Sequence, residues 1–205
     1  MASIPLFPLN TILFPDGQLS LQVFEVRYLD MIQTCIDTGS EFGVVSLLQG
    51  SEVRKPGRST ESLSNVGTMA RIVDWSAPLA GLMQITCVGT TRFRIQSSEQ
   101  LKHGLWIAEV EPIADDRVVP VPAEQDDVAM ALRTLIASLQ KKRAPPAQMA
   151  LAPPYRLDEA GWVANRWCEL LRLNLHEKQR LLAQDNPVLR LELVQDALNE
   201  NGLLG

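Results

Sequence analysis

The sequence predicts an α+β protein in which a strand-rich part, residues 1–118, precedes a helical part, residues 119–205. In the first part, apolar residues form short runs or alternate with polar ones, as in strands that are buried on one face. In the second part, they recur every three or four residues, which indicates amphipathic helices. The Pro-rich stretch VPVPAEQ (119–125) separates the two patterns and is typical of a joint between subdomains.

The first predicted strand has an unusual composition. Its run, IPLFPLNTILFP (4–15), is too apolar for a solvated loop, and its closely spaced prolines exclude a helix. Proline lacks the N–H that a central strand donates, so the run is expected at the edge of a sheet. LSLQVF (19–24) alternates as a half-buried strand does, whereas residues 25–37 change to a helical period that ends at Gly39.

The other strands of the first part are predicted by the same patterns. FGVVSLL (42–48) is a near-continuous apolar run, which suits a strand covered on both faces. The polar residues 49–65 are expected to form a mobile surface loop. A hairpin around SAPLAG and two further strands are expected, over residues 68–75, 82–88, 91–96 and 105–113. Short strands with one inserted helix favour a small, partly closed barrel.

The helical part is predicted to contain four helices. The first carries an apolar stripe with acidic residues at its start and basic residues at its end, which suits the helix dipole; the stripe consists of Val128, Leu132, Leu135, Ile136 and Leu139. The Pro-rich segment 144–155 is expected to be a loop. The predicted caps of the later helices are Asp158, Asn174 with Glu177, and Asn186 with Pro187, and Gly202 lies past the last helix.

Composition and charge exclude several classes of protein. Of the 205 residues, 46% are hydrophobic and 21% are charged, as in ordinary globular domains. The net charge is −5 and neither part has a basic excess, so a nucleic acid backbone is a poor ligand. The scattered Cys35, Cys87 and Cys168 are expected to be reduced. Because no signal peptide and no apolar span of about 18 residues occurs, we expect a cytoplasmic protein outside the membrane.

Catalytic motifs are missing from the sequence. Neither the phosphate-binding loop G-x-x-x-x-G-K-[ST] nor G-x-G-x-x-G occurs, which argues against ATP hydrolysis. The only histidines, His103 and His176, have no ligand at metal spacing, and no serine has the setting of a nucleophile. We therefore expect no cofactor, no metal and no enzymatic activity.

A set of motifs in order along the chain resembles the N-terminal, substrate-binding domain of Lon proteases. The opening match runs over residues 4–32, and its signature positions are Pro5–Leu9, Gly17, Leu19, Leu21, Phe24, Glu25, Arg27 and Tyr28. FGVV (42–45), VGTMARI (66–72), the G-x-x-R-F-R-I of 89–95 and the tail 173–198 follow in the order that the family has them. The resemblance thus covers nearly the whole chain.

The resemblance implies a PUA-like pseudo-barrel followed by a helical bundle, in a domain that binds polypeptides. In full-length Lon, an ATPase and a Ser–Lys protease follow this domain. Because the chain ends at Gly205 without a phosphate loop, it is expected to be a stand-alone recognition module. Its expected partners are unfolded or exposed polypeptide segments, or a partner protease or chaperone, and weak self-association stays open. The alternative is RNA binding by the PUA-like barrel through a face formed by Arg92 and Arg94.

The signature residues are interpreted as determinants of the fold. Phe24 and Phe93 are expected in the core. Glu25 is expected to accept N–H groups of the first helical turn, and Arg27 to pair with a nearby acid, while Tyr28 buries its ring.

The polypeptide-binding surface is expected where apolar residues lie in loops. Its candidates are Trp75, Pro78 and Leu79 at the hairpin tip, and Met149, Leu151 and Tyr155 in the Pro-rich loop. The alternative for each of these residues is that it anchors its loop in the core.

Overall fold

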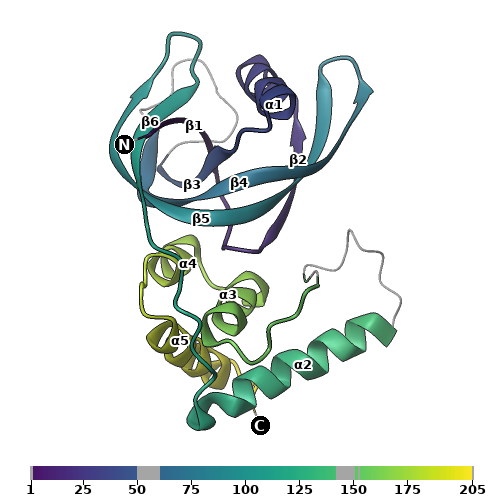
Figure 1. The fold of residues 1–205 in the computed structure, drawn as a ribbon, viewed down its shortest axis with the longest axis vertical. Coiled ribbons are helices and arrows are strands. Elements are labelled where there is room, and N and C mark those ends of the chain that lie inside the picture. The colour runs from purple at the N-terminus through teal and green to yellow at the C-terminus, as the bar shows by residue number, and fades with distance from the viewer. Residues whose placement is uncertain (1, 50–60, 142–150, 152, 205) are drawn as a thin grey trace. The chain divides into compact units, whose positions relative to one another are not determined.

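The computed structural model describes residues 2–49, 61–141, 151 and 153–204 (Figure 1). Contacts divide the chain into two compact units, Met1–Ala114 and Asp115–Gly205, called here the first and the second unit. The first unit contains the sheet and one helix, and the second unit is helical, so the predicted α+β class is confirmed. That residues 1–118 and 119–205 are two separate domains stays a prediction.

The first unit is a six-stranded sheet that closes on itself. Its strands are β1 (Ala2–Leu9), β2 (Gln18–Val23), β3 (Phe42–Gln49), β4 (Ser62–Leu79), β5 (Leu82–Gln100) and β6 (Trp106–Pro112). The order is β2-β5-β4-β3-β1-β6, and a further pairing between β5 and β6 closes a five-stranded barrel. Both β2 and β6 lie on the side of β5 away from β4, with β2 beside its first half and β6 beside its second half.

The prediction that the Pro-rich first strand lies at an edge is wrong. β1 pairs in parallel with β3 on one side and antiparallel with β6 on the other (Figure 1). Pro5 lies opposite Ile107 in the ladder with β6, and Pro8 lies opposite Val45 in the ladder with β3, so each proline is paired on one side only. The physical reason is closure: a barrel leaves its strands no open edges, and β1 buries Leu6 in the barrel core and Phe7 and Leu9 in the core beneath α1.

The central hairpin is longer than the sequence indicates. The strand predicted over residues 91–96 is the continuation of β5, and β4 likewise extends from Ser62 to Leu79. Register shifts mark the bend, where Ala70 lies opposite Gly89 but Thr68 lies opposite Arg92. Such irregularities let one strand turn without ending. Gly81, with φ of 76°, forms the tight turn between the pair Leu79 and Leu82.

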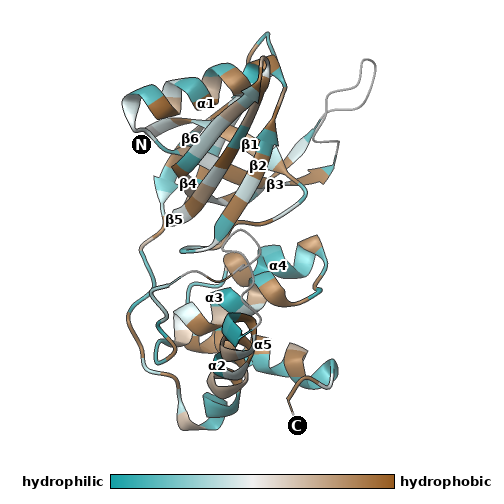
Figure 2. Cartoon of the chain, turned by 90° about the vertical axis from the view of Figure 1, so that its right-hand side faces the viewer, coloured by the Kyte–Doolittle hydropathy of each residue, from teal (hydrophilic) through white to brown (hydrophobic). Residues whose placement is uncertain are grey.

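Helix α1 (Val26–Thr38) covers one face of this sheet, and Figure 2 shows it lying across the strands. Tyr28, Ile32 and Cys35, which follow the predicted helical period, are buried, and Gly39 ends the helix in the left-handed conformation as expected. The ring of Tyr28 stacks on that of Phe7 with centroids 4.1 Å apart. A second, smaller core fills the barrel; its buried members are Ile4, Leu6, Val45, Phe93, Ala108 and Val110.

The second unit contains four α-helices among the described residues: α2 (Asp126–Lys141), α3 (Ala160–Leu170), α4 (Leu175–Leu182) and α5 (Pro187–Glu200), with the short 3-10 helix η1 (Ala123–Gln125) before α2. The capping box of Asn174 and Glu177 and the Asn186 cap are confirmed. The Asp158 cap is wrong, because α3 begins after Glu159 and no side chain caps it. In the described part of the chain, no helix is both long and apolar enough for a membrane span.

Candidate functional site

Arg27, Glu25 and Tyr28 form a buried structural contact. The Arg27 guanidinium, only 6% exposed, donates to the Gly104 carbonyl at 2.6 Å and to the Glu25 carboxylate at 3.2 Å. It also lies 4.5 Å from the centre of the Tyr28 ring. Arg27 therefore ties the first turn of α1 to the turn between β5 and β6. This geometry agrees with the interpretation of these residues as fold determinants, and it corrects the role of Glu25, which caps no N–H group.

Phe24 is not a core residue. Its side chain is 55% exposed, and the neighbouring Val26 is 72% exposed. Val23 points into the core opposite Met83, and successive side chains of a strand alternate between faces, so Phe24 points away. Phe93, predicted with it, is buried in the barrel. The alternation in LSLQVF contains this information, since Val23 and not Phe24 continues the row of Leu19 and Leu21.

Trp75 lies on the hairpin arm, defined here as residues 73–85, where β4 and β5 run out to their turn. Trp75 is 48% exposed and lies opposite Ile85, which in turn lies opposite Leu21 of β2. Ile85 belongs to the same buried cluster as Tyr28 of α1. The exposed Trp75 ring is therefore continuous with the face of the sheet on which α1 packs.

The structure separates Trp75 from Leu79. Leu79 is 69% exposed and lies opposite Leu82, whereas Trp75 lies opposite Ile85. Because Leu82 and Ile85 are three residues apart in one strand, their side chains, and those of their partners, are on opposite faces. Pro78 is also exposed. The arm thus presents apolar side chains on both faces, of which only the Trp75 face continues the core.

The candidates in the second unit do not form a comparable surface. Leu151 is 1% exposed, so its proposed role as an exposed contact is wrong. Tyr155 is half-buried and packs edge-on against Trp162, with ring centroids 6.3 Å apart. Met149 lies outside the described residues.

The arginine face of the RNA-binding alternative does not form. Arg92 is 3% exposed, whereas Arg94 is exposed. Arg92 lies opposite Thr68, which is fully buried, so this row of the sheet is not open to solvent. A single exposed arginine is no basic patch, and phosphate binding needs several cations close together.

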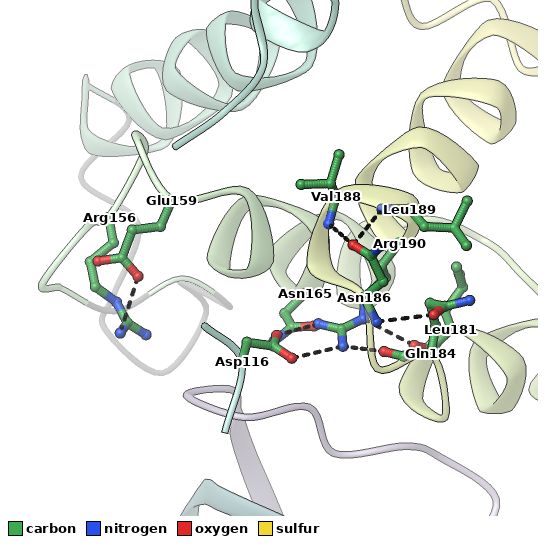
Figure 3. Close-up of polar contacts among 10 residues, drawn as sticks. All are labelled: Asp116, Arg156, Glu159, Asn165, Leu181, Gln184, Asn186, Val188, Leu189 and Arg190. Atoms are coloured by element: carbon green, nitrogen blue, oxygen red, sulfur yellow. Dashed lines mark hydrogen bonds and ion pairs between the residues drawn. The ribbon is translucent and has the colours of Figure 1, made fainter. Parts of the chain in front are cut away.

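A buried ionic network organises the second unit (Figure 3). Arg190 of α5 donates to both carboxylate oxygens of Asp116, at 2.5 and 3.1 Å, and to the Asn165 side chain at 3.0 Å. It also donates to the carbonyls of Leu181, at 3.1 Å, and Gln184. One side chain therefore joins the segment before α2, helix α3 and the end of α4. No sequence pattern reveals this network, because its members are spread from residue 116 to residue 190.

The titratable groups give little indication of catalysis. Burial raises the pKa of the Cys168 thiol to about 12, and burial together with nearby Cys35 raises that of Cys87 to about 12. Thiols held protonated in this way are poor nucleophiles. Among residues 2–49, 61–141, 151 and 153–204, no group of His, Cys, Asp or Glu side chains suits a metal ion.

The chain is an α+β protein of a recognisable class: a closed barrel of parallel and antiparallel strands carries one helix, and a helical unit follows it in the sequence. Residues 3–200 match the family described as the ATP-dependent protease La (LON) substrate-binding domain, and the chain is a member of that family. The crystal structure of a Lon N-terminal domain protein from Xanthomonas campestris superposes with a TM-score of 0.76 at 32% identity, covering 96% of this chain and 98% of that one.

More distant relatives agree with this assignment. The N-terminal domain of the Mycobacterium avium complex Lon protease shares the fold, with a TM-score of 0.63 at 17% identity over 97% of this chain and 98% of that one. A Lon protease of Anaeromyxobacter dehalogenans (strain 2CP-C) is 26% identical over 97% of this chain. The chain spans 23% of the length of that relative. The resemblance predicted from the sequence is thus confirmed as family membership.

Proposed function

We propose that the first unit binds exposed apolar segments of other polypeptides, with Trp75 on the hairpin arm as its main anchor. The observation that supports this most is an exposed tryptophan joined to the core in a family of substrate-binding domains. Aromatic side chains beside a packed surface are the residues that most often dominate protein recognition. Leu79, on the other face of the arm, and the exposed Pro78 are secondary contacts.

The chemistry of this surface suits polypeptides that expose apolar side chains, whatever their sequence. Fully burying one large apolar side chain contributes roughly 1.5–3 kcal/mol. A single anchor with a few weaker neighbours therefore gives low affinity, which suits a protein that samples many unfolded chains. On the face of the arm opposite Trp75, Ser76 and Gln84 carry no charge, and the one acidic residue beside them is Asp74.

We further propose that the chain itself hydrolyses neither ATP nor peptide bonds and presents clients to a partner protease or chaperone. Support comes from the match to a substrate-binding domain and from the missing phosphate loop in the sequence. The free thiols Cys35, Cys87 and Cys168 support work in a reducing compartment, the cytoplasm. Nucleotide turnover or peptide cleavage by the purified protein would overturn this part of the proposal.

The experiment measures binding of a reduced, carboxymethylated protein, which stays unfolded, by fluorescence anisotropy. Trp75→Ser should weaken binding about tenfold, equivalent to about 1.4 kcal/mol. Leu48→Ser is the matched control, because Leu48 is 51% exposed on the same unit but lies at the far end of the β3–β4 ladder. Both variants should melt within a few degrees of the parent, since exposed substitutions change stability little.

Two results would contradict the proposal. Equal affinities of the Trp75→Ser and Leu48→Ser variants would remove Trp75 from the binding surface. A steep fall in affinity with rising salt would indicate charge-driven binding, whereas apolar contacts depend weakly on salt.

A further inference from the structure

One strand of the first unit keeps an open edge along its whole length. Each strand of the closed barrel has a neighbour on both sides, in β4 only from Ser62 to Ala70, but β2 pairs with β5 alone. Among the strands of the described residues, none lies along its other side. The burial of β2 agrees, because every residue from Gln18 to Gln22 is exposed or half-exposed, unlike the fully buried start of β3. An open edge presents N–H and C=O groups for another strand.

The hydrogen bonds at the start of β2 show which residues face outward. Gly89 N donates to the Gly17 carbonyl at 2.9 Å, so this carbonyl points toward β5, while the Gly17 N–H donates to Phe14 in the preceding turn. In an antiparallel ladder, alternate residues face the partner strand. The register runs without a shift from Gln18 opposite Val88 to Val23 opposite Met83, so the backbone N–H and C=O groups of Leu19, Leu21 and Val23 point toward β5. The outward backbone groups are those of Gln18, Ser20 and Gln22.

These outward positions lack the usual protection of an edge. Natural edges carry lysine, proline or a bulge that blocks pairing. The six residues of β2, QLSLQV, contain no charge and no proline, and its ladder with β5 runs without a register shift. The sequence from Gln18 to Gln22 also reads the same in both directions, Gln-Leu-Ser-Leu-Gln.

We propose that a second copy of this chain pairs with the β2 edge in antiparallel orientation, about a twofold axis through Ser20. In this register, Ser20 meets the same residue of the other copy, and Gln18 meets Gln22. Each of these facing pairs exchanges two backbone hydrogen bonds, since their N–H and C=O groups point outward. Leu19 meets Leu21 between them, in the closely spaced positions where apolar side chains touch.

A second copy suits this edge better than an unrelated strand. A twofold contact requires that the same surface complement itself, and a palindromic strand meets this condition at every pair. No like charges oppose one another, and beyond the palindrome Val23 would meet Gly17, which has no side chain. One short ladder buries less than the roughly 1,200 Å² of a stable interface, so the dimer should be weak. This pairing is independent of the proposed polypeptide binding.

The first experiment tests the register by oxidation of single-cysteine variants. In the described residues the native Cys35, Cys87 and Cys168 are buried, so the folded protein gives little background. Ser20→Cys should form a disulfide-linked dimer, because Cα atoms of such a pair are about 5.5 Å apart, within disulfide range. Gln22→Cys alone should not, since its two copies lie about 13 Å apart along the ladder.

A mixture supplies the positive control for the register. Gln18→Cys and a tagged Gln22→Cys should cross-link with each other when mixed and not when alone. Cross-linking of Gln22→Cys with itself, or none by Ser20→Cys at millimolar protein, would overturn the proposal. The proposal would also be overturned if the Ser20→Cys variant cross-linked to an added unfolded client in preference to a second copy of the variant.

The second experiment measures mass by sedimentation velocity over a range of concentrations. The parent should shift from one chain toward two as concentration rises. Ser20→Lys should stay monomeric at least tenfold further in concentration, because it places two lysines at the twofold axis. Ser76→Lys, on the same face but on β4, is the matched control and should associate like the parent. A parent that stays monomeric up to about 1 mM, or equal behaviour of the two lysine variants, would overturn the proposal.

Discussion

Replacing Arg190 by methionine tests whether one buried side chain holds the second unit together. Arg190 is 1% exposed and its guanidinium joins Asp116, Asn165 and two carbonyls from the end of α4 (Figure 3). Methionine has a similar length and no charge, so the variant removes the hydrogen bonds while filling most of the space. The perturbation is thus electrostatic rather than a change of packing.

The magnitude follows from the groups left behind. Asp116 would keep a carboxylate that is 19% exposed and has lost its bidentate partner. Breaking a buried ion pair by removing one member costs about 3–5 kcal/mol. A sum of about 1.5–3 kcal/mol for every charge-assisted bond would exceed this range. Bonds in one network are not additive, so the range for the broken ion pair is the better guide. Partial solvation of Asp116 favours the lower end, about 3 kcal/mol, which lowers the melting temperature of a domain of this size by roughly 12–24 °C.

The assay is urea unfolding followed by the fluorescence of the second unit. Trp162 and Trp167 are buried in α3, so a Trp75→Phe, Trp106→Phe background leaves only these reporters. The matched control is Arg156→Met, since Arg156 is 38% exposed and pairs with Glu159 at 3.5 Å. A surface pair of this kind contributes about 0.5 kcal/mol. If both variants lost the same stability, the buried network would not be what holds the second unit together.

The remaining predictions concern backbone packing and the buried thiols. Gly89→Ala should destabilise the first unit by about 1–3 kcal/mol in thermal unfolding, because an added Cβ would lie 2.2 Å from the Phe14 carbonyl oxygen; Ser98→Ala, exposed on the same strand, is the control, and equal melting temperatures would refute the reasoning. Since folding raises the pKa of Cys87 and Cys168 from 9.0 to about 12, their stabilising effect is complete below pH 9 and is lost as pH rises toward 12. Cys168→Ala should therefore flatten the fall of the free energy of unfolding between pH 9 and 11, and an unchanged slope would contradict it.

The helices of this protein could be predicted closely, and the reason is local. The stripe of α1 and its Gly39 end depend on residues within a few turns of one another. The same is true of the Asn174 and Asn186 caps, whose side chains bond backbone N–H groups two or three residues away. The Asp158 cap failed because another segment of the second unit meets the start of α3: Ala160 N donates to the Val119 carbonyl.

The candidate site could be predicted only in part. Trp75 and Leu79 stand out in the sequence by their place beside turn residues, and the structure places both on the surface. Their division between two faces depends on the pairing of β4 with β5, which includes register shifts that no local pattern reveals. The burial of Leu151 could not be predicted, because a Pro-rich segment says nothing about what packs over it.

The sequence by itself determined the local elements: strand and helix periods, caps, turns, and the family to which the chain belongs. Only the tertiary structure decided which strand lies at an edge, since closure placed the proline-bearing β1 between two neighbours and left β2 open. It also decided which side chains are covered: Phe24, expected in the core, is exposed, and Arg92, expected on the surface, is buried. Periodicity fixes the face on which a side chain lies, but whether that face meets solvent depends on residues far away in the chain.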